Sequence, residues 1–284
     1  MASRGRRAAR LVAAFYRKAY EENVTGLSGM VAYNLLLSVF PLALLALFIA
    51  GHVLESRELE HSIFQDLKRL FPSAADRTLT SALDRIRDSS TGLGVLALLS
   101  SIWIGSSFWG ALDTAFCRIY HVDCRSWLEQ KRFALLMLVV VLLFFAATVS
   151  VPTLQSLLLS GASDLPFGLD NVPGVIYGLT LVAGLVLLFG ILCLIYSTVP
   201  NRRVPWRAVW PGAVGATLAI GIVDYAFPAY LTNISTIARV GTTFVFVLIA
   251  LVWFYALAII LLGGAVVNAM RFELHETGEL RTQG

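Results

Sequence analysis

Long apolar blocks separated by short polar segments dominate the chain. Six blocks carry almost no charge, and they run over residues 27–51, 92–112, 133–159, 174–199, 211–231 and 240–269. A helix that crosses a bilayer needs about 20 predominantly apolar residues. The pattern therefore predicts an all-α integral membrane protein with six transmembrane helices, forming a single domain over residues 1–284.

The segments outside these blocks also show helical periodicity. Between the first two spans, residues 52–91 contain two apolar stripes on either side of Pro72, which predict an amphipathic helical hairpin. The stripes are Leu59, Ile63, Leu67 and Leu70, then Leu79, Leu83 and Ile86. At the N-terminus, Leu11, Val12, Phe15 and Ala19 share a helical face among basic residues, which predicts a short interfacial helix on an anionic leaflet.

Charge distribution predicts the orientation. The chain is 57% hydrophobic and 14% charged, whereas a soluble domain is closer to one quarter charged. Lys and Arg gather in the N-terminal segment, around residues 118–132 and 202–207, and near the C-terminus, while the loop 161–173 has none. Because cytoplasmic loops are enriched in Lys and Arg, both termini are expected in the cytoplasm and the hairpin outside it. The net charge of +4 then reflects topology, and nucleic-acid binding is not expected.

Three residues weaken the first span: Asn34, Ser38 and Pro41. Proline has no N–H, so the carbonyl of Leu37 loses its helical donor and a kink is expected. Asn34 and Ser38 lie one turn apart on one face. They are either interhelical hydrogen-bonding groups or part of the wall of a polar cavity.

Two acidic residues and a second proline mark other spans. Asp224 lies within the fifth span, where a carboxylate costs about 2.5–3.5 kcal/mol, so we expect it to face protein or water. It is either part of an ion or solute pathway or a structural acid. Pro228, one turn on, predicts a second kink, and the two kinked turns are candidates to face each other. Asp113, at the end of the second span, completes the pathway candidates Asp224, Asn34, Ser38 and Asp113.

Small residues recur in two spans, which favours close helix packing. They are Ser100, Ser101, Gly105, Ser106, Ser107 and Gly110 in the second span, and Gly263, Gly264 and Asn268 in the last.

Catalytic motifs are absent from the sequence. No phosphate-binding loop or nucleophile elbow occurs. Cys117, His121 and Cys124 lie within eight residues, but a structural zinc site needs four ligands, so ordinary interfacial residues are the better interpretation. We expect no enzyme activity, no metal and no cofactor.

Several segments together resemble the YihY/BrkB family of bacterial inner-membrane proteins. They are the first span with Tyr33, Ser38, Phe40 and Pro41, then ALDTAFCRIY (111–120), PNRRVPWRAVWPGA (200–213) and the last span ending on Asn268. The resemblance implies six spans, cytoplasmic ends and an inner-membrane location. The family also carries a historical ribonuclease BN label, but metal-dependent RNA cleavage needs a clustered set of His and Asp ligands, which this chain lacks.

Two functional hypotheses follow from the spans. The first is a transporter or permease for a small solute, ion or lipid. The alternative is a non-catalytic assembly or scaffold protein of the envelope. Expected partners are the lipid bilayer and anionic lipids at the cytoplasmic face; a homo-oligomer is left open.

Overall fold

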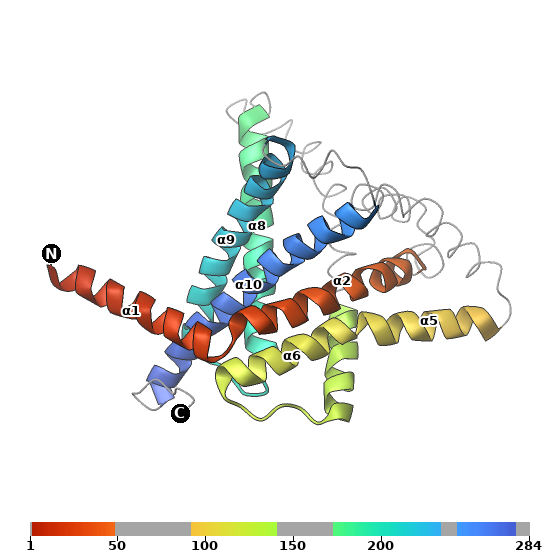
Figure 1. The fold of residues 1–284 in the computed structure, drawn as a ribbon, viewed down its shortest axis with the longest axis horizontal. Helices are drawn as coiled ribbons and strands as arrows, with labels where there is room; N and C mark the ends of the chain where they lie inside the picture. The colour runs from red at the N-terminus through yellow and green to blue at the C-terminus, as the bar shows by residue number, and fades with distance from the viewer. Residues whose placement is uncertain (1, 49–91, 141–172, 234–242, 277–284) are drawn as a thin grey trace, which may run out of the picture. The chain divides into compact units, whose positions relative to one another are not determined.

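The computed structural model describes residues 2–48, 92–140, 173–233 and 243–276, and these are helical apart from short connections (Figure 1). The helices are α1 (Ala2–Glu21), α2 (Val24–Phe48), α5 (Gly92–Gly105), α6 (Ser107–Tyr120), a helix over 127–140, α8 (Pro173–Thr198), α9 (Trp206–Asn233) and α10 (Thr243–Glu276). The prediction of an all-α chain is confirmed for these residues.

Most predicted spans coincide with one observed helix. α2, α8, α9 and α10 lie on the first, fourth, fifth and sixth spans, extended or trimmed by a few residues. The second span differs, because Ser106 divides it into α5 and α6. The third span is described only to residue 140, and the hairpin 52–91 lies outside the described residues.

Within the residues that the structure describes, two windows are long and apolar enough to cross a membrane, Trp206–Asp224 in α9 and Val247–Leu274 in α10. Shorter apolar stretches occupy Val24–Val39 in α2 and Gly184–Thr198 in α8. The count of six spans and their orientation stay predictions.

The chain divides into two compact units. One comprises Met1–Asn34, Gly110–Gln130 and Val182–Gly284, and the other Leu35–Trp109 and Lys131–Leu181.

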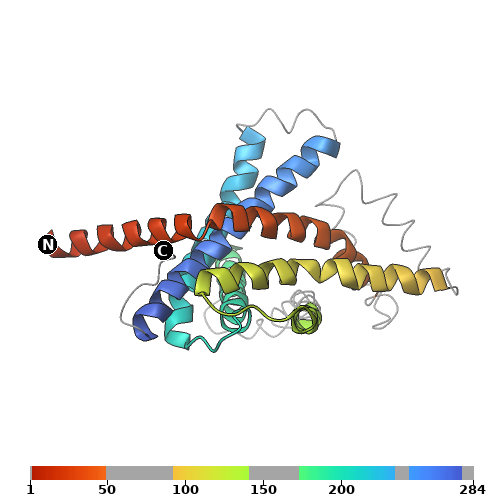
Figure 2. The same ribbon diagram turned by 60° about the horizontal axis from the view of Figure 1, so that its bottom comes forward.

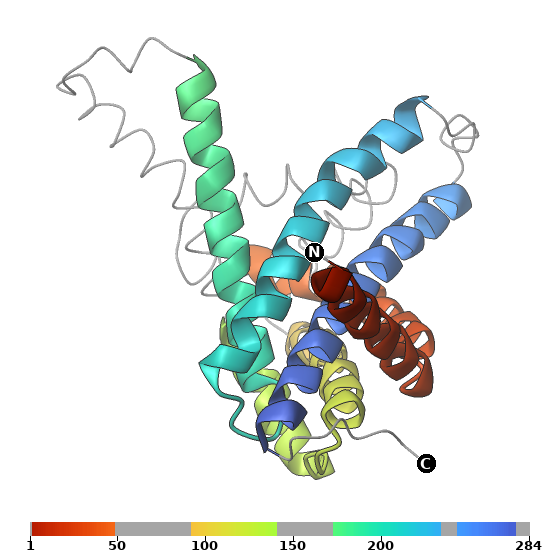
Figure 3. The same cartoon turned by 90° about the vertical axis from the view of Figure 1, so that its left-hand side faces the viewer.

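In the first unit, α9 packs along α10 near the start of α9 and the C-terminal half of α10. The backbone N–H of Gly212 donates to Oδ1 of Asn268 at 2.8 Å, and the backbone of Gly264 lies close by. The two helices separate toward residues 233 and 243 (Figure 3). The small residues of the last span therefore do serve helix packing.

A buried aromatic cluster holds α6, α8 and α10 together. Phe116 stacks on Tyr120 and on Tyr196, with ring centroids 5.9 and 6.0 Å apart, and Tyr120 also contacts Phe272. The hydroxyl of Tyr196 donates to the carbonyl of Leu261 at 2.8 Å. This cluster fixes the ends of three helices beside the charged residues described below.

The C-terminal part of α1 lies against α10 (Figure 2). A Cβ atom at Gly263 would be 3.8 Å from Cζ of Phe15, whereas Leu11 and Val12 are exposed. Part of the apolar face predicted for α1 therefore packs against α10.

Candidate functional site

The break between α5 and α6 lies against α2 within the second unit. α5 ends at Gly105 and α6 begins at Ser107, and the hydroxyl of Ser38 in α2 donates to the carbonyl of Ile104 at 3.2 Å. Oγ of Ser38 also lies 3.2 Å from Oγ of Ser107. A serine from one helix thus satisfies a backbone carbonyl at the interruption of another.

The same contact includes the turn of α2 around Pro41. α2 continues through Pro41 to Phe48, and Leu42 approaches Gly105 so closely that a Cβ atom there would lie 3.1 Å from Cδ2 of Leu42. We call the region formed by Ser38, Pro41, Leu42 and Ile104–Ser107 the interrupted-helix contact. In membranes, irregular backbone is tolerated where it is buried in protein or lines a water-filled cavity.

Asn34 uses its side chain within its own helix. Its Nδ2 donates to the carbonyl of Met30 at 2.9 Å, and the side chain is half-buried. Asn34 and Ser38 share a helix as predicted, but Ser38 serves the carbonyl of Ile104 in α5.

A buried charge network occupies the first unit, joining α1, the end of α6 and α10. Lys18 forms an ion pair with Oε1 of Glu273, and both side chains are less than 5% exposed. His121 lies between two carboxylates, with Nδ1 3.2 Å from Glu273 and Nε2 2.7 Å from Glu22. Lys18, Glu22, His121 and Glu273 are called the α1–α10 charge network below.

The end of α6 gives His121 its position. The N–H of His121 bonds to the carbonyl of Arg118 and that of Val122 to Cys117, which is the Schellman pattern of a helix C-terminus. His121 is the left-handed residue of that turn, with φ of 52°, where glycine is the usual choice. This turn directs the imidazole toward the carboxylates of Glu22, which follows α1, and Glu273 in α10.

The contacts of His121 define the chemistry of the network. A neutral imidazole has one donor and one acceptor nitrogen. Bonding to Glu22 and Glu273 at once therefore requires a proton on both nitrogens or on one carboxyl group.

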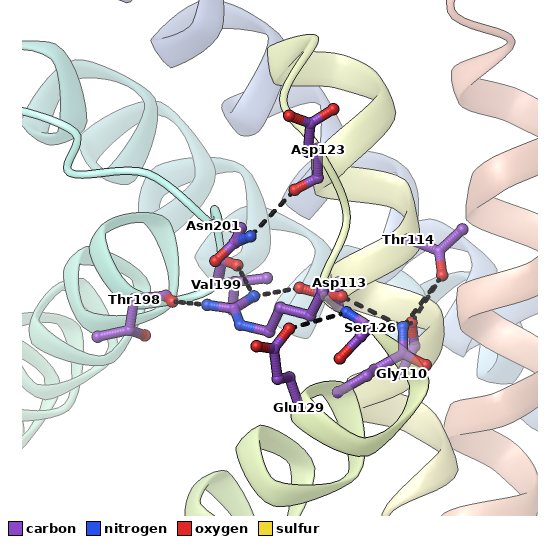
Figure 4. A network of polar contacts seen from close by, with 11 residues as sticks. Gly110, Asp113, Thr114, Asp123, Ser126, Glu129, Thr198, Val199 and Asn201 are labelled. Atoms are coloured by element: carbon purple, nitrogen blue, oxygen red, sulfur yellow. Dashed lines mark hydrogen bonds and ion pairs between the residues drawn. The ribbon is translucent and has the colours of Figure 1, made fainter.

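A second buried network surrounds Asp113 (Figure 4). The guanidinium of Arg125 pairs with Asp113 and donates to the carbonyls of Val199, at 2.7 Å, and Thr198, at 3.2 Å. Gln130 donates to the other oxygen of Asp113 at 3.2 Å. Asp113 is fully buried, and in this arrangement it anchors the segment after α6 to the end of α8.

The local sequence explains how Arg125 and Gln130 are held. Ser126 and Glu129 form part of a capping box, in which Glu129 accepts from the N–H of Ser126 at 3.0 Å and begins the helix over 127–140. Asn201 donates to the carbonyl of Asp123 at 3.1 Å and ties the α8–α9 loop to the same segment.

Asp224 is exposed on α9. Of the small residues that precede it on one face, Ala213 and Thr217 are buried, Gly221 is half-buried against Leu185 of α8, and Asp224 emerges from the packed surface. Pro228 lies inside α9, which continues to Asn233. Ser38 and Asp224 belong to different units, so the facing of the two kinked turns stays a prediction, as do the kinks.

The cysteine and histidine cluster is used for packing and ion pairing. Cys117 is buried and Cys124 exposed, and burial raises the pKa of the Cys117 thiol. Both nitrogens of His121 contact carboxylates. Within the described residues, no group of three or more His, Cys, Asp or Glu side chains is arranged to hold a metal ion.

The sequence model of the family described as "Virulence factor BrkB" matches residues 15–283. The chain belongs to the BrkB family. The resemblance noted from the sequence is thus confirmed, and this BrkB chain is a membrane protein, as its apolar helices and the names of its relatives indicate.

Relatives of this BrkB chain include membrane proteins and one named as ribonuclease-like. It is 28% identical to a UPF0761 membrane protein of Ralstonia nicotianae over 89% of its own length and 56% of the relative's. A UPF0761 membrane protein of Nitrosospira multiformis is 25% identical over 88% of the chain, and the chain spans 58% of that relative. A Bacillus subtilis protein named "Putative ribonuclease-like protein YfkH" is 25% identical, with 89% of this chain and 90% of YfkH covered. No solved structure matches the BrkB chain.

Sequence reasoning missed the α1–α10 charge network. Lys18 belongs to the basic N-terminal segment used to predict the orientation, and the structure buries it against Glu273, 255 residues away. The spacing of Lys18 and Glu22, one turn apart, was the available local signal. No sequence feature near Lys18 or Glu22 predicts their contacts with His121 and Glu273.

Proposed function

We propose that this protein is a six-span protein of the bacterial cytoplasmic membrane, with both termini cytoplasmic, that moves a small solute, ion or lipid across the bilayer. The observation that supports transport is the interrupted-helix contact. Ser38, one turn before Pro41, bonds the backbone where α5 and α6 are divided. Breaks in membrane helices form substrate and ion sites in many transporters, and the break here is confined to Ser106, whose N–H still bonds to the carbonyl of Ile102.

The chemistry of the contact suits a small polar cargo. The contact offers hydroxyl groups from Ser38 and Ser107, with Ser106 bonded to the carbonyl of Trp103 at 2.8 Å. Hydroxyls can donate and accept, so they can exchange a mutual hydrogen bond for one to a passing solute. We include Asn34 and Asp224 as further groups of the pathway, and we assign Asp113 to the anchoring of Arg125.

The proposed membrane position changes the expected depth of Asp224. If the cytoplasmic boundary lies at Trp206, Asp224 is 18 residues further along α9, or about 27 Å. The hydrocarbon core is about 30 Å thick. Asp224 then belongs near the outer boundary of the membrane.

A scaffold role is the alternative. The two buried charge networks support it, because they hold the helices of the first unit together.

A ribonuclease role is not proposed. His121 contacts Glu22 and Glu273, the pattern of an ion-pair network rather than of a metal site with an open position.

Solute entry into liposomes tests the proposal. The full chain is reconstituted, and entry of glycerol, potassium ions and protons is compared with protein-free liposomes. If the protein is a transporter, at least one probe enters faster than in protein-free liposomes, and Ser38→Ala lowers that rate. Ser197→Ala is the control and should keep the parent rate, because it loses only a hydrogen bond within its own helix. Unchanged rates for all probes would favour the scaffold, and unchanged flux in Asp224→Asn would remove Asp224 from the pathway.

A further inference from the structure

An exposed group of three arginines and one tryptophan lies where α9 begins and α10 ends. The guanidinium of Arg271 lies 5.7 Å from the ring centroid of Trp210, and that of Arg202 lies 5.4 Å from the ring centroid of Phe272. Arg207 is exposed one turn before Trp210. We call Arg202, Arg207, Trp210 and Arg271 the basic-aromatic patch.

The patch coincides with the ends of two apolar windows. One window begins at Trp206 and the other ends at Leu274, and the bond from Gly212 to Asn268 packs these two ends together. Tryptophan and arginine at the ends of apolar helices are typical of the headgroup level of a bilayer. The patch thus lies at the level of lipid phosphates.

An apolar ridge leads away from the patch along α9. Trp210, Val214, Leu218 and Ile222 follow one another at four-residue spacing, and all four are exposed. From Trp210 to Ile222 the ridge runs about 18 Å, slightly more than one leaflet of a hydrocarbon core about 30 Å thick. A cationic end joined to an apolar ridge of this length has the shape and chemistry of one phospholipid.

We propose that the basic-aromatic patch and this ridge bind one anionic phospholipid, with its phosphate between Arg207 and Arg271 and an acyl chain along Val214, Leu218 and Ile222. The phosphate is the partner because guanidinium groups bond to phosphate oxygens in pairs. The stacking of Arg271 on Trp210 holds one guanidinium at the start of the ridge. This inference uses the membrane location and does not rest on transport.

Native mass spectrometry of the full chain in detergent tests the site, with added phosphatidylglycerol and phosphatidylcholine as probes. The chain is expected to retain one phosphatidylglycerol in preference to phosphatidylcholine. Arg207→Gln with Arg271→Gln is expected to weaken that binding about 30-fold, since each arginine near an anionic lipid surface contributes about 1 kcal/mol.

The matched control removes two exposed arginines outside the patch, Arg17→Gln with Arg132→Gln, and leaves the net charge equal to that of the first variant. Its binding is expected to stay within twofold of the parent chain, roughly the scatter of additive surface effects. Equal losses in the two double variants would overturn the site, because attraction by net charge would then suffice. Circular dichroism and thermal unfolding of each variant establish that it is folded.

Leu218→Ser tests the ridge and separates a lipid from a free anion. The variant is expected to weaken the binding of phosphatidylglycerol. It should leave the binding of glycerol phosphate unchanged, because glycerol phosphate carries the headgroup charge without acyl chains. If glycerol phosphate binds as tightly as the lipid, the ligand is a soluble anion and the lipid proposal is wrong. A dimer that the patch variants abolish would also contradict it, because the surface would then bind a second copy.

Discussion

The N–H of Gly212 in α9 donates a 2.8 Å hydrogen bond to Oδ1 of Asn268 in α10, and both residues are buried. A Cβ atom at position 212 would lie 2.3 Å from the carbonyl oxygen of Gly264 and 2.4 Å from that Oδ1. The approach of the two helices therefore requires glycine at this position.

Gly212→Ala is expected to destabilise the protein by about 1–3 kcal/mol, because the methyl group forces α9 away from α10. Gly215→Ala is the control on the same helix, since a Cβ atom there meets nothing within 4 Å. It should be neutral or stabilising by up to about 1 kcal/mol, as alanine favours the helix. Denaturant unfolding in detergent micelles measures both, and equal effects would contradict this account of the contact.

Breaking the ion pair of Lys18 and Glu273 from one side should be costly. Lys18→Met or Glu273→Gln leaves a buried charge without its main partner, and a loss of about 3–5 kcal/mol is expected for either. The double variant should lose less than the sum, because it leaves neither charge alone. Unfolding of the three variants forms a double-mutant cycle. Strict additivity would show that the two side chains do not interact in the membrane protein.

Arg125 should not tolerate lysine. Its guanidinium contacts Asp113 and the carbonyls of Val199 and Thr198, and an ammonium group cannot reproduce that planar set of donors. Arg125→Lys is expected to lower stability by about 1–3 kcal/mol. Arg132→Lys, at an exposed position, provides the comparison and should change stability by about 0.5 kcal/mol or less.

The two cysteines near the end of α6 should differ in reactivity. The thiolate is the reactive form, and burial raises the pKa of the Cys117 thiol, so less thiolate forms there at any given pH. Maleimide should label Cys124, which is exposed, and leave Cys117 unlabelled from neutral to mildly alkaline pH. Mass spectrometry of digested protein reads out both sites, and rapid labelling of Cys117 would show that this end of α6 opens.

The helices could be predicted well, because a long apolar helix can be recognised from the local composition alone. The division at Ser106 could not be predicted, since the donor that satisfies the carbonyl of Ile104 is Ser38, 66 residues away. Lys18 shows the same limit. Nothing in the local sequence indicates that Lys18 is buried, and only the packing of α1 on α10 brings it to Glu273. Asp113 was a pathway candidate, yet Arg125, 12 residues on, turns back to pair with it.

Cysteine accessibility tests the central proposal, that a solute pathway passes through the interrupted-helix contact. In a variant whose native cysteines are replaced, Ser107→Cys is compared with Leu99→Cys, which lies in α5 of the same unit and is 58% exposed. A membrane-impermeant, charged thiol reagent is applied to the protein in its native membrane. The account predicts that Ser107→Cys reacts, because its thiol faces a polar, hydrated contact, and that Leu99→Cys does not, because lipid covers it. If Ser107→Cys is as unreactive as Leu99→Cys from both sides of the membrane, the contact is dry and the proposed pathway does not pass through it.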